Sequence, residues 1–316
     1  MKYNKALIIC IVLLIISMLL SMLWNIGNIN EALSQSILFQ VRVPRTLQAL
    51  LAGIGLTLAG HMFQTLLINP LADSFTLGLA SGATFGSGIA VVLGLSFLWL
   101  PVFSVIFSVI TLITVISLTT AMSKGYPIRT LILSGIMIGA LFNAFLYVLI
   151  IFNQQKMNNI VNYMFGGFSS AEYNEVIYIG ITLFIGIIVL CSLIPKIKIL
   201  QLGHLKGTSL GLNVQSLTYC VLLIASLITA VIVAYVGIIG FIGMIIPQLV
   251  RRQGQQFNLG QQMVLNMFIG GIVMVMSDWL GSILLSPFEI PASIILALLG
   301  IPVLFYIMIT QPRSIE

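Results

Sequence analysis

The sequence predicts an all-α polytopic membrane protein, and three observations favour this class. Hydrophobic residues make up 59% of the chain and charged residues only 6%, whereas an average soluble protein carries about 25% charged residues. The mean hydropathy is +1.17. The apolar runs are long and unbroken, whereas a transmembrane β-barrel has segments of about ten residues in which apolar and polar residues alternate. Because no long polar segment is present, we expect residues 1–316 to form a single transmembrane domain.

Hydropathy and turn signals divide the chain into about ten helices, since a helix of about 20 apolar residues crosses a bilayer. The first is expected to be a retained membrane helix, because its long apolar run lacks a clear cleavage site. The eighth is short for a full crossing, which indicates that some elements are broken or re-entrant. In chain order the predicted helices cover about 6–24, 46–68, 78–95, 101–122, 129–152, 176–195, 214–236, 239–250, 261–284 and 291–310.

The distribution of basic residues predicts that both termini are cytoplasmic, because cytoplasmic loops are enriched in Lys and Arg. The net charge of +6 then reflects topology, and we expect membrane lipid but no nucleic acid as a partner. This orientation leaves only Arg42, Arg45 and Lys156 outside. The ten basic residues that it places inside are Lys2, Lys5, Lys124, Arg129, Lys196, Lys198, Lys206, Arg251, Arg252 and Arg313.

Two groups of helices are predicted to have opposite orientation. The second to fifth helices and the seventh to tenth are separated by five crossings, and an odd number reverses direction. If the groups are structural repeats, they are inverted repeats, which are a transporter architecture. The sequence similarity between them is too weak to demonstrate a repeat.

Residue patterns for catalysis or metal binding are lacking. There is no phosphate-binding loop, and Gly203–Thr208 has the wrong spacing for one. The three cysteines show no paired spacing, so we expect neither a disulfide nor a metal site. Asp278 is the one clear candidate for ion coupling within the predicted helices, and a structural hydrogen-bonding role is the alternative.

Arg42 and Arg45 are exceptional for their position. They lie on the side that basic residues avoid, at the predicted start of the second helix, where Pro44 suits the first turn. The helix dipole disfavours cations there. From the residues alone, two interpretations stay open. The arginines reach the membrane interface, or they bind an acidic partner, because guanidinium groups match carboxylates bidentately.

Five sequence blocks, in order along almost the whole chain, resemble the FecCD-type family of ABC importer permeases for iron chelates, haem and cobalamin. The blocks are Arg42–Thr46, Asn69–Asp73, Leu77–Ala83, Val236–Pro247 followed by Arg251 and Arg252, and Glu289–Pro291 with Leu299–Pro302. The resemblance implies structural roles for the motif residues Asn69, Pro70, Asp73, Gly240, Gly243, Pro247 and Asp278.

The resemblance also implies three functional surfaces. Arg42, Arg45 and Glu289 would dock an extracytoplasmic substrate-binding protein, which a lipid can anchor. The cytoplasmic segment would couple to an ATPase subunit through Leu202, Gly203, Leu205, Lys206, Gly207, Thr208, Ser209, Leu210 and Gly211. The translocation pathway, at the interface of two permease subunits, would be lined by residues such as Ser134, Asn143, Asn153, Ser293 and Tyr306.

The implied assembly is a permease of the bacterial cytoplasmic membrane, paired as a homodimer or heterodimer. Two ATPase subunits would bind ATP and Mg, and this chain would bind no cofactor. A ferric siderophore is the favoured cargo, with haem and cobalamin as alternatives. An ion-driven secondary transporter and a membrane-embedded partner without transport activity are the rival classes.

Three departures from the family pattern concern single positions. Gln248 replaces a frequent His, Ser282 replaces a docking Arg, and Ser293 replaces a Gly. The Ser282 departure implies a weaker or asymmetric docking contact on this subunit, as in a heterodimer.

Overall fold

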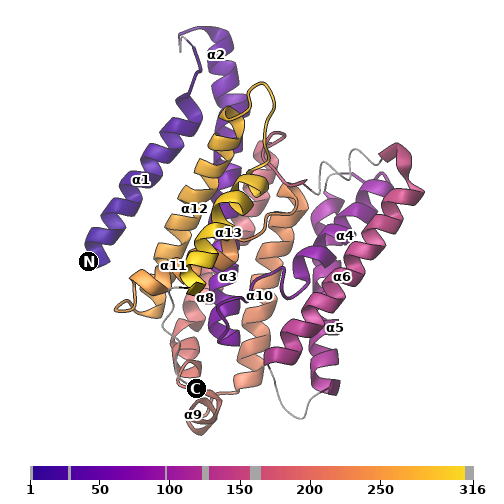
Figure 1. Ribbon diagram of the computed structural model, residues 1–316, viewed down its shortest axis with the longest axis vertical. Coiled ribbons are helices and arrows are strands. Elements are labelled where there is room, and N and C mark those ends of the chain that lie inside the picture. The colour runs from indigo at the N-terminus through magenta and orange to yellow at the C-terminus, as the bar shows by residue number, and fades with distance from the viewer. Residues whose placement is uncertain (1–2, 28–29, 97, 123–127, 157–164, 310–316) are drawn as a thin grey trace.

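The computed structural model describes residues 3–27, 30–96, 98–122, 128–156 and 165–309, and its main elements are helices (Figure 1). Lys2, Lys124 and Arg313, which entered the topology prediction, lie outside these residues. Each of the ten predicted helices has a counterpart in the structure. They are α1 (Tyr3–Leu23), α3 (Val43–Leu67), α4 (Leu79–Val92), α5 (Trp99–Met122), α6 (Ile128–Phe152), α8 (Tyr173–Leu200), α10 (Val214–Val236), α11 (Ile242–Gln253), α12 (Leu259–Ile283) and α13 (Ala292–Ile309).

Among the residues that the structure describes, seven helical segments are long and apolar enough to cross a membrane. The short helices α4 and α11 have 14 and 12 residues, so each rises only about 20 Å. The count of ten crossings therefore stays a prediction. In both proposed groups the second helix is the shortest, but the fourth helices differ, since α6 has 25 residues and α13 has 18, so the predicted repeat and its inversion stay predictions.

The predicted start of the second helix is wrong. Short α2 (Ala32–Ile37), a π-helical turn (Leu38–Arg42) and α3 form one continuous span, Ala32–Leu67. Pro44 lacks an N–H and cannot continue the α-helical bonding pattern, and in the preceding turn Val43 N–H donates to the Leu38 carbonyl instead. Arg42 and Arg45 are therefore inside a long helix, and the helix dipole does not disfavour them.

Helix α3 lies at the centre of the bundle (Figure 1). In the most apolar 18-residue stretch of the span Ala32–Leu67, 83% is buried, whereas the corresponding share is 22% in α1 and 22% in α8. Glycines allow this packing, because a Cβ added to Gly60 would lie 1.9 Å from the Gly243 carbonyl oxygen of α11. A Cβ on Gly53 would lie 2.3 Å from the Gly270 carbonyl oxygen of α12. Small residues permit such close approach of helices in lipid.

A glutamine on α3 compensates for a proline in α11. Pro247 has no N–H to donate to the Gly243 carbonyl, which lies one turn earlier in that helix. Gln64 Nε2 donates instead to the carbonyls of Gly243, at 3.3 Å, and Met244, at 2.9 Å. This contact ties the start of α11 to the core of the bundle.

The connection between α3 and α4 is a tight polar turn. Asp73 Oδ1 accepts hydrogen bonds from the backbone N–H groups of Phe75, at 3.0 Å, and Thr76, at 2.8 Å. Burial raises the pKa of Asp73 above its ordinary value, and these hydrogen bonds oppose the shift. Asn69 Oδ1 accepts from Leu71 N–H, and Gln248 of α11 donates to the Pro70 carbonyl. The turn is thus held both locally and by α11.

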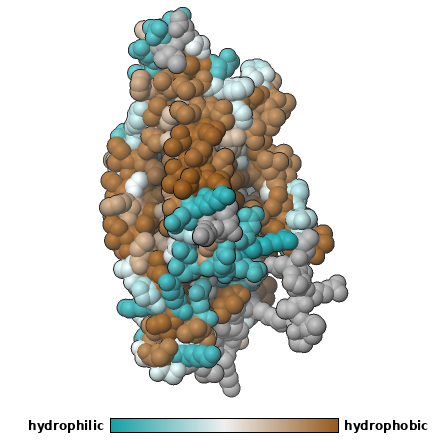
Figure 2. Space-filling model, turned by 90° about the vertical axis from the view of Figure 1, so that its left-hand side faces the viewer, coloured by the Kyte–Doolittle hydropathy of each residue, from teal (hydrophilic) through white to brown (hydrophobic). Residues whose placement is uncertain are grey.

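The surface fits a membrane environment. Figure 2 shows apolar residues over much of the upper part of one face, with hydrophilic residues gathered in its lower half. Helix α1 illustrates the apolar part, since Ile8, Val12 and Ile15 are each about half exposed. The short helix α9 (His204–Ser209) and α2 lie at opposite ends of the bundle (Figure 1). We refer to these as the α9 end and the α2 end.

Candidate functional site

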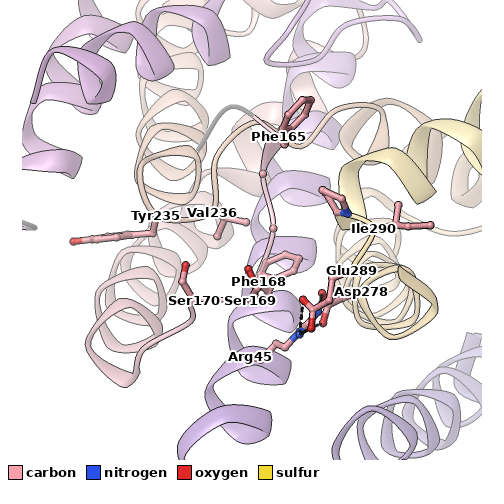
Figure 3. A pocket seen from close by; sticks show the side chains of 13 residues that line it. Arg45, Phe165, Phe168, Ser169, Ser170, Tyr235, Val236, Asp278, Glu289 and Ile290 are labelled. Carbon is pink, nitrogen blue, oxygen red and sulfur yellow. Dashed lines mark hydrogen bonds and ion pairs between the residues drawn. The ribbon is translucent and has the colours of Figure 1, made fainter. Parts of the chain in front are cut away.

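A charged cluster joins three segments that are distant in sequence (Figure 3). Arg45 extends from α3, Asp278 from α12 and Glu289 from the connection between α12 and α13. Arg45 Nε donates to Asp278 Oδ2 at 2.7 Å, and Nη2 donates to Oδ1 at 2.9 Å. Nη1 donates to the two carboxylate oxygens of Glu289 at 3.0 and 3.1 Å. In the described part of the chain, both ion pairs involve Arg45.

The cluster forms one wall of a cavity of about 600 Å³ (Figure 3). The segment Phe165–Ser170 also lines the cavity, and its Gly167 N–H donates to the Val236 carbonyl at 2.9 Å. Gly166 has a φ of +62°, and an added Cβ would lie 2.5 Å from the Ile238 carbonyl oxygen, so glycine is required there. The remaining lining comes from the end of α10 and from the Ile290–Pro291 stretch before α13.

Arg42 lies one helical turn before Arg45 and is half-buried. Its Nη1 donates to the Ser21 carbonyl of α1 at 3.2 Å. The Ser21 hydroxyl also lies 2.9 Å from the Thr46 hydroxyl, so α1 and α3 are joined here by polar contacts. The two predicted docking arginines thus differ, because in the described part of the chain both ion pairs with carboxylates belong to Arg45.

Asp278 is the residue for which the sequence left two roles open, ion coupling or structural hydrogen bonding. Its side chain is 4% exposed and is bonded through both oxygens to Arg45. This arrangement favours a structural role, because both carboxylate oxygens are already bonded to the guanidinium.

The predicted coupling segment forms a compact turn at the α9 end (Figure 1). Gly203 and Gly211 flank α9 with φ values of +104° and +79°, which favour glycine. Leu202 and Leu210 are exposed by 57% and 63%, although both are apolar. The Leu205 side chain lies outside the described residues.

Within this segment, Gly207 and Thr208 were equivalent candidates for the contact with a partner, and they differ in exposure. Gly207 is buried, and an added Cβ would lie 3.1 Å from Val214 Cγ2 of the same chain. Thr208, Ser209 and Lys206 are exposed. A partner would therefore contact Thr208 rather than Gly207.

The predicted pathway residues do not form one cluster within this chain. Ser134, Asn143 and Asn153 belong to α6 or follow it, and Asn153 borders a groove between α4, α5 and α6 that five phenylalanines line. Ser293 and Tyr306 belong to α13, which lies apart from α6 in Figure 1. Ser293 donates to the Phe165 carbonyl, so it helps to hold the cavity wall.

Two features of this region were not predicted from the sequence. The first is the pairing of Arg45 with Asp278, which are separated by 233 residues. The second is the buried Glu175 of α8, which accepts a hydrogen bond from Gln48 of α3. A carboxylate and an amide within apolar helices were the available signals, but their partners depend on tertiary structure.

Several named proteins are similar to this chain. It is 32% identical over 295 residues to an uncharacterized ABC transporter permease protein, YvrB of Bacillus subtilis. The aligned region covers 92% of this chain and 83% of YvrB. Identity is 30% over 276 residues with the molybdate import system permease protein MolB of Haemophilus influenzae, covering 86% and 80% of the two chains. It is 31% over 282 residues with the Fe(3+)-citrate import system permease protein YfmE of Bacillus subtilis, covering 88% and 83%.

A solved structure is also similar over the whole chain. It is described as an inward-facing conformation of a metal-chelate type ABC transporter, with a TM-score of 0.87 and 29% identity, covering 98% of this chain and all of the other. The helical fold and these relatives define a permease subunit of an ABC importer in the cytoplasmic membrane, and not an enzyme. Residues 6–310 match the FecCD transport family, and the chain belongs to that family.

Proposed function

We propose that this chain is the membrane permease of an importer for a metal chelate, and that a ferric siderophore is its cargo. The observation that carries the proposal is the similarity over 98% of the chain to a metal-chelate type ABC transporter. YfmE supports an iron chelate, whereas MolB shows that a related permease serves molybdate. Ferric siderophores and oxyanions are therefore the two cargo classes to separate by experiment.

We further propose that a binding protein delivers the cargo at the α2 end. Arg42 and Arg45 are cations at a position where the membrane topology disfavours them. The cavity beside Arg45 supports an entry point there, since it combines charged groups with hydroxyl and backbone hydrogen-bonding groups. Arg side chains suit the recognition of a partner's carboxylates.

We propose that two ATPase subunits bind at the α9 end, around Leu202–Gly211, and that a second permease completes the pore. ATP and Mg would be bound by the ATPase subunits. Exposed Leu202 and Leu210 support a protein contact, because an isolated chain exposes them to solvent at a membrane surface. Nucleotide binding and hydrolysis would then change the pore between outward and inward states.

Two measurements test this function. The first is purification from the native membrane followed by mass spectrometry of the retained proteins. We expect an ATPase subunit, either alone or with a second, different permease. Recovery of the chain alone, with ion-gradient-driven uptake in liposomes, would overturn the proposal in favour of a secondary transporter.

The second measurement identifies the cargo. Cells lacking this chain are assayed for uptake of ferric hydroxamate, ferric citrate, haem, cobalamin and molybdate, with and without the restored protein. We expect restored uptake of a ferric chelate. Restored uptake of molybdate alone would show that the importer belongs to the family but that the siderophore assignment is wrong.

A further inference from the structure

The two carboxylates that bind Arg45 are not equivalent. The Asp278 side chain is 4% exposed and bonds through both oxygens to two different guanidinium nitrogens. The Glu289 side chain is 47% exposed and bonds through both oxygens to the single nitrogen Nη1. A buried bidentate pair is costly to break, whereas an exposed pair contributes little and dissociates easily.

The positions of the two acids in the fold increase this difference. Asp278 belongs to α12, one of the long apolar helices, and is fixed by the packing of α12 against α3. Glu289 belongs to the connection between α12 and α13, beside Ile290 and Pro291 of the cavity wall (Figure 3). Because Glu289 lines the cavity and is about half exposed, a movement of Glu289 changes the exposed edge of the cavity, while Asp278 can keep Arg45 in place.

The charges raise a difficulty for docking by an acidic partner. Arg45, Asp278 and Glu289 together carry a net charge of −1, and Arg42 nearby brings the cluster to zero. A further carboxylate arriving at Arg45 would be repelled by Glu289, because like charges at short distance disfavour one another. Such docking is favourable only if Glu289 leaves the guanidinium.

We propose that Glu289 is an exchangeable counter-ion of Arg45, and that a carboxylate of the binding protein takes its place on Nη1. Asp278 is then a positioning residue that keeps the guanidinium oriented during the exchange. Release of Glu289 removes its contact between the connection before α13 and α3, while the Ile290 N–H still donates to the Gly281 carbonyl at 3.0 Å, and it widens the cavity at its exposed edge. The exchange step rests on the proposed docking at Arg45, whereas the closure of the cavity by Glu289 does not.

The first experiment tests closure without a partner. Val236 lines the cavity and is 3% exposed, so we use Val236→Cys in a full-length chain whose three native cysteines are replaced by alanine. A membrane-impermeant thiol reagent labels this position in nanodiscs. We expect Glu289→Gln to raise the labelling rate several-fold. The control is Glu172→Gln, which removes an exposed carboxylate at the start of α8 and should leave the rate unchanged. An unchanged rate in Glu289→Gln would overturn the closure.

The second experiment tests the exchange. The probe is the binding protein recovered by cross-linking to the intact importer, and the readout is its Kd for the importer in nanodiscs. We expect Glu289→Gln to bind about two to five times more tightly, as removal of a competing exposed pair predicts. Weaker or unchanged binding would overturn the exchange.

Two further variants separate the exchange from the docking on which it rests. If Arg42→Gln and Arg45→Gln both leave the Kd unchanged, the docking proposal itself is wrong, and the exchange fails with it. The labelling assay contains no partner, so its result then still decides whether Glu289 closes the cavity. Elution of each variant as the intact complex checks that the substitutions do not unfold it.

Discussion

Arg45, whose side chain is 14% exposed, and the buried Asp278 form a pair of parallel hydrogen bonds, 2.7 and 2.9 Å long, that joins α3 to α12 across 233 residues of sequence. A charged pair of this kind, once formed in a membrane protein interior, cannot lose one member cheaply, because the other is left buried and unpaired. The pair therefore constrains how α3 and α12 move during transport. It predicts that this part of the permease moves as a unit.

Asp278→Asn should destabilise the protein strongly. The amide keeps one acceptor but loses the charge, so the guanidinium retains only the exposed Glu289 as an anionic partner. Removal of one member of a buried pair costs about 3–5 kcal/mol. The measurement is the thermal unfolding temperature of the purified full-length chain in detergent.

Glu289→Gln is the matched control for this loss. The same chemical change at a side chain that is 47% exposed should cost less than about 1 kcal/mol. Equal shifts of the unfolding temperature in the two variants would show that Asp278 is no more important to the structure than Glu289.

Arg42 and Arg45 should respond differently to the same substitution. Arg42→Gln removes a hydrogen bond to the Ser21 carbonyl and a proposed docking charge, so we expect reduced uptake at low binding-protein concentration with nearly normal stability. The loss in apparent affinity should be up to about fivefold, as for an exposed ion pair.

Arg45→Gln should impair both uptake and stability, because it leaves Asp278 buried without its cation. Uptake of radiolabelled cargo and protein content in the membrane separate the two effects. Normal uptake by Arg42→Gln at every binding-protein concentration would contradict a docking role for that residue.

Much of the helical architecture could be predicted from the sequence, because apolar runs and turn residues are local signals. All ten predicted ranges correspond to helices, and α10 has the predicted bounds 214–236. The main error was at Pro44, which ordinarily indicates a first helical turn. Here the chain instead uses a π-helical turn to continue through the proline. Local composition does not distinguish these two outcomes.

The candidate site was predictable only in part. The sequence singled out Arg45, Asp278 and Glu289 separately, because each is a charge in an apolar context. Their assembly into one cluster follows from the packing of α12 against α3, which single-sequence patterns do not report. Gln48 and Glu175 were missed for the same reason, because the burial of each side chain is explained by its hydrogen bond to the other, which forms only in the folded structure.

The structure sharpens the prediction for the coupling segment. Thr208→Trp places a bulky group on the exposed side of α9, so we expect ATP hydrolysis to continue while most transport is lost. The assay is ATP consumed per cargo molecule in proteoliposomes containing the whole importer. Gln255→Trp, an exposed position in the connection between α11 and α12, is the control. Unchanged coupling in Thr208→Trp would remove the assignment of this segment.

The crossing of α3 and α11 should not tolerate a methyl group. Gly60→Ala places a Cβ 1.9 Å from a backbone carbonyl oxygen of Gly243, so one of the helices must shift. We expect destabilisation at the upper end of the range of about 1–3 kcal/mol that overpacking causes. Gly180→Ala in α8 is the control, because its nearest neighbour, a Leu51 methyl, would lie at an ordinary 3.6 Å. Equal unfolding temperatures for the two variants would contradict the close crossing.

Gln64 and Pro247 should show an interaction energy in a double-mutant cycle. Gln64→Leu leaves the Gly243 and Met244 carbonyls without the amide donor, and an unsatisfied buried polar group costs about 1–3 kcal/mol. Pro247→Ala restores a backbone N–H that can donate to the Gly243 carbonyl within α11. Gln64→Leu should therefore cost less in the Pro247→Ala background.

The neighbouring Thr65→Val is a suitable control for that cycle. Its buried hydroxyl has no hydrogen-bond partner in the described part of the chain, so removing it should be neutral or stabilising. Unfolding temperatures of the four cycle members and of Thr65→Val, measured in one detergent, give the comparison. If Gln64→Leu costs the same with proline or alanine at position 247, the glutamine does not compensate for the missing N–H of the proline.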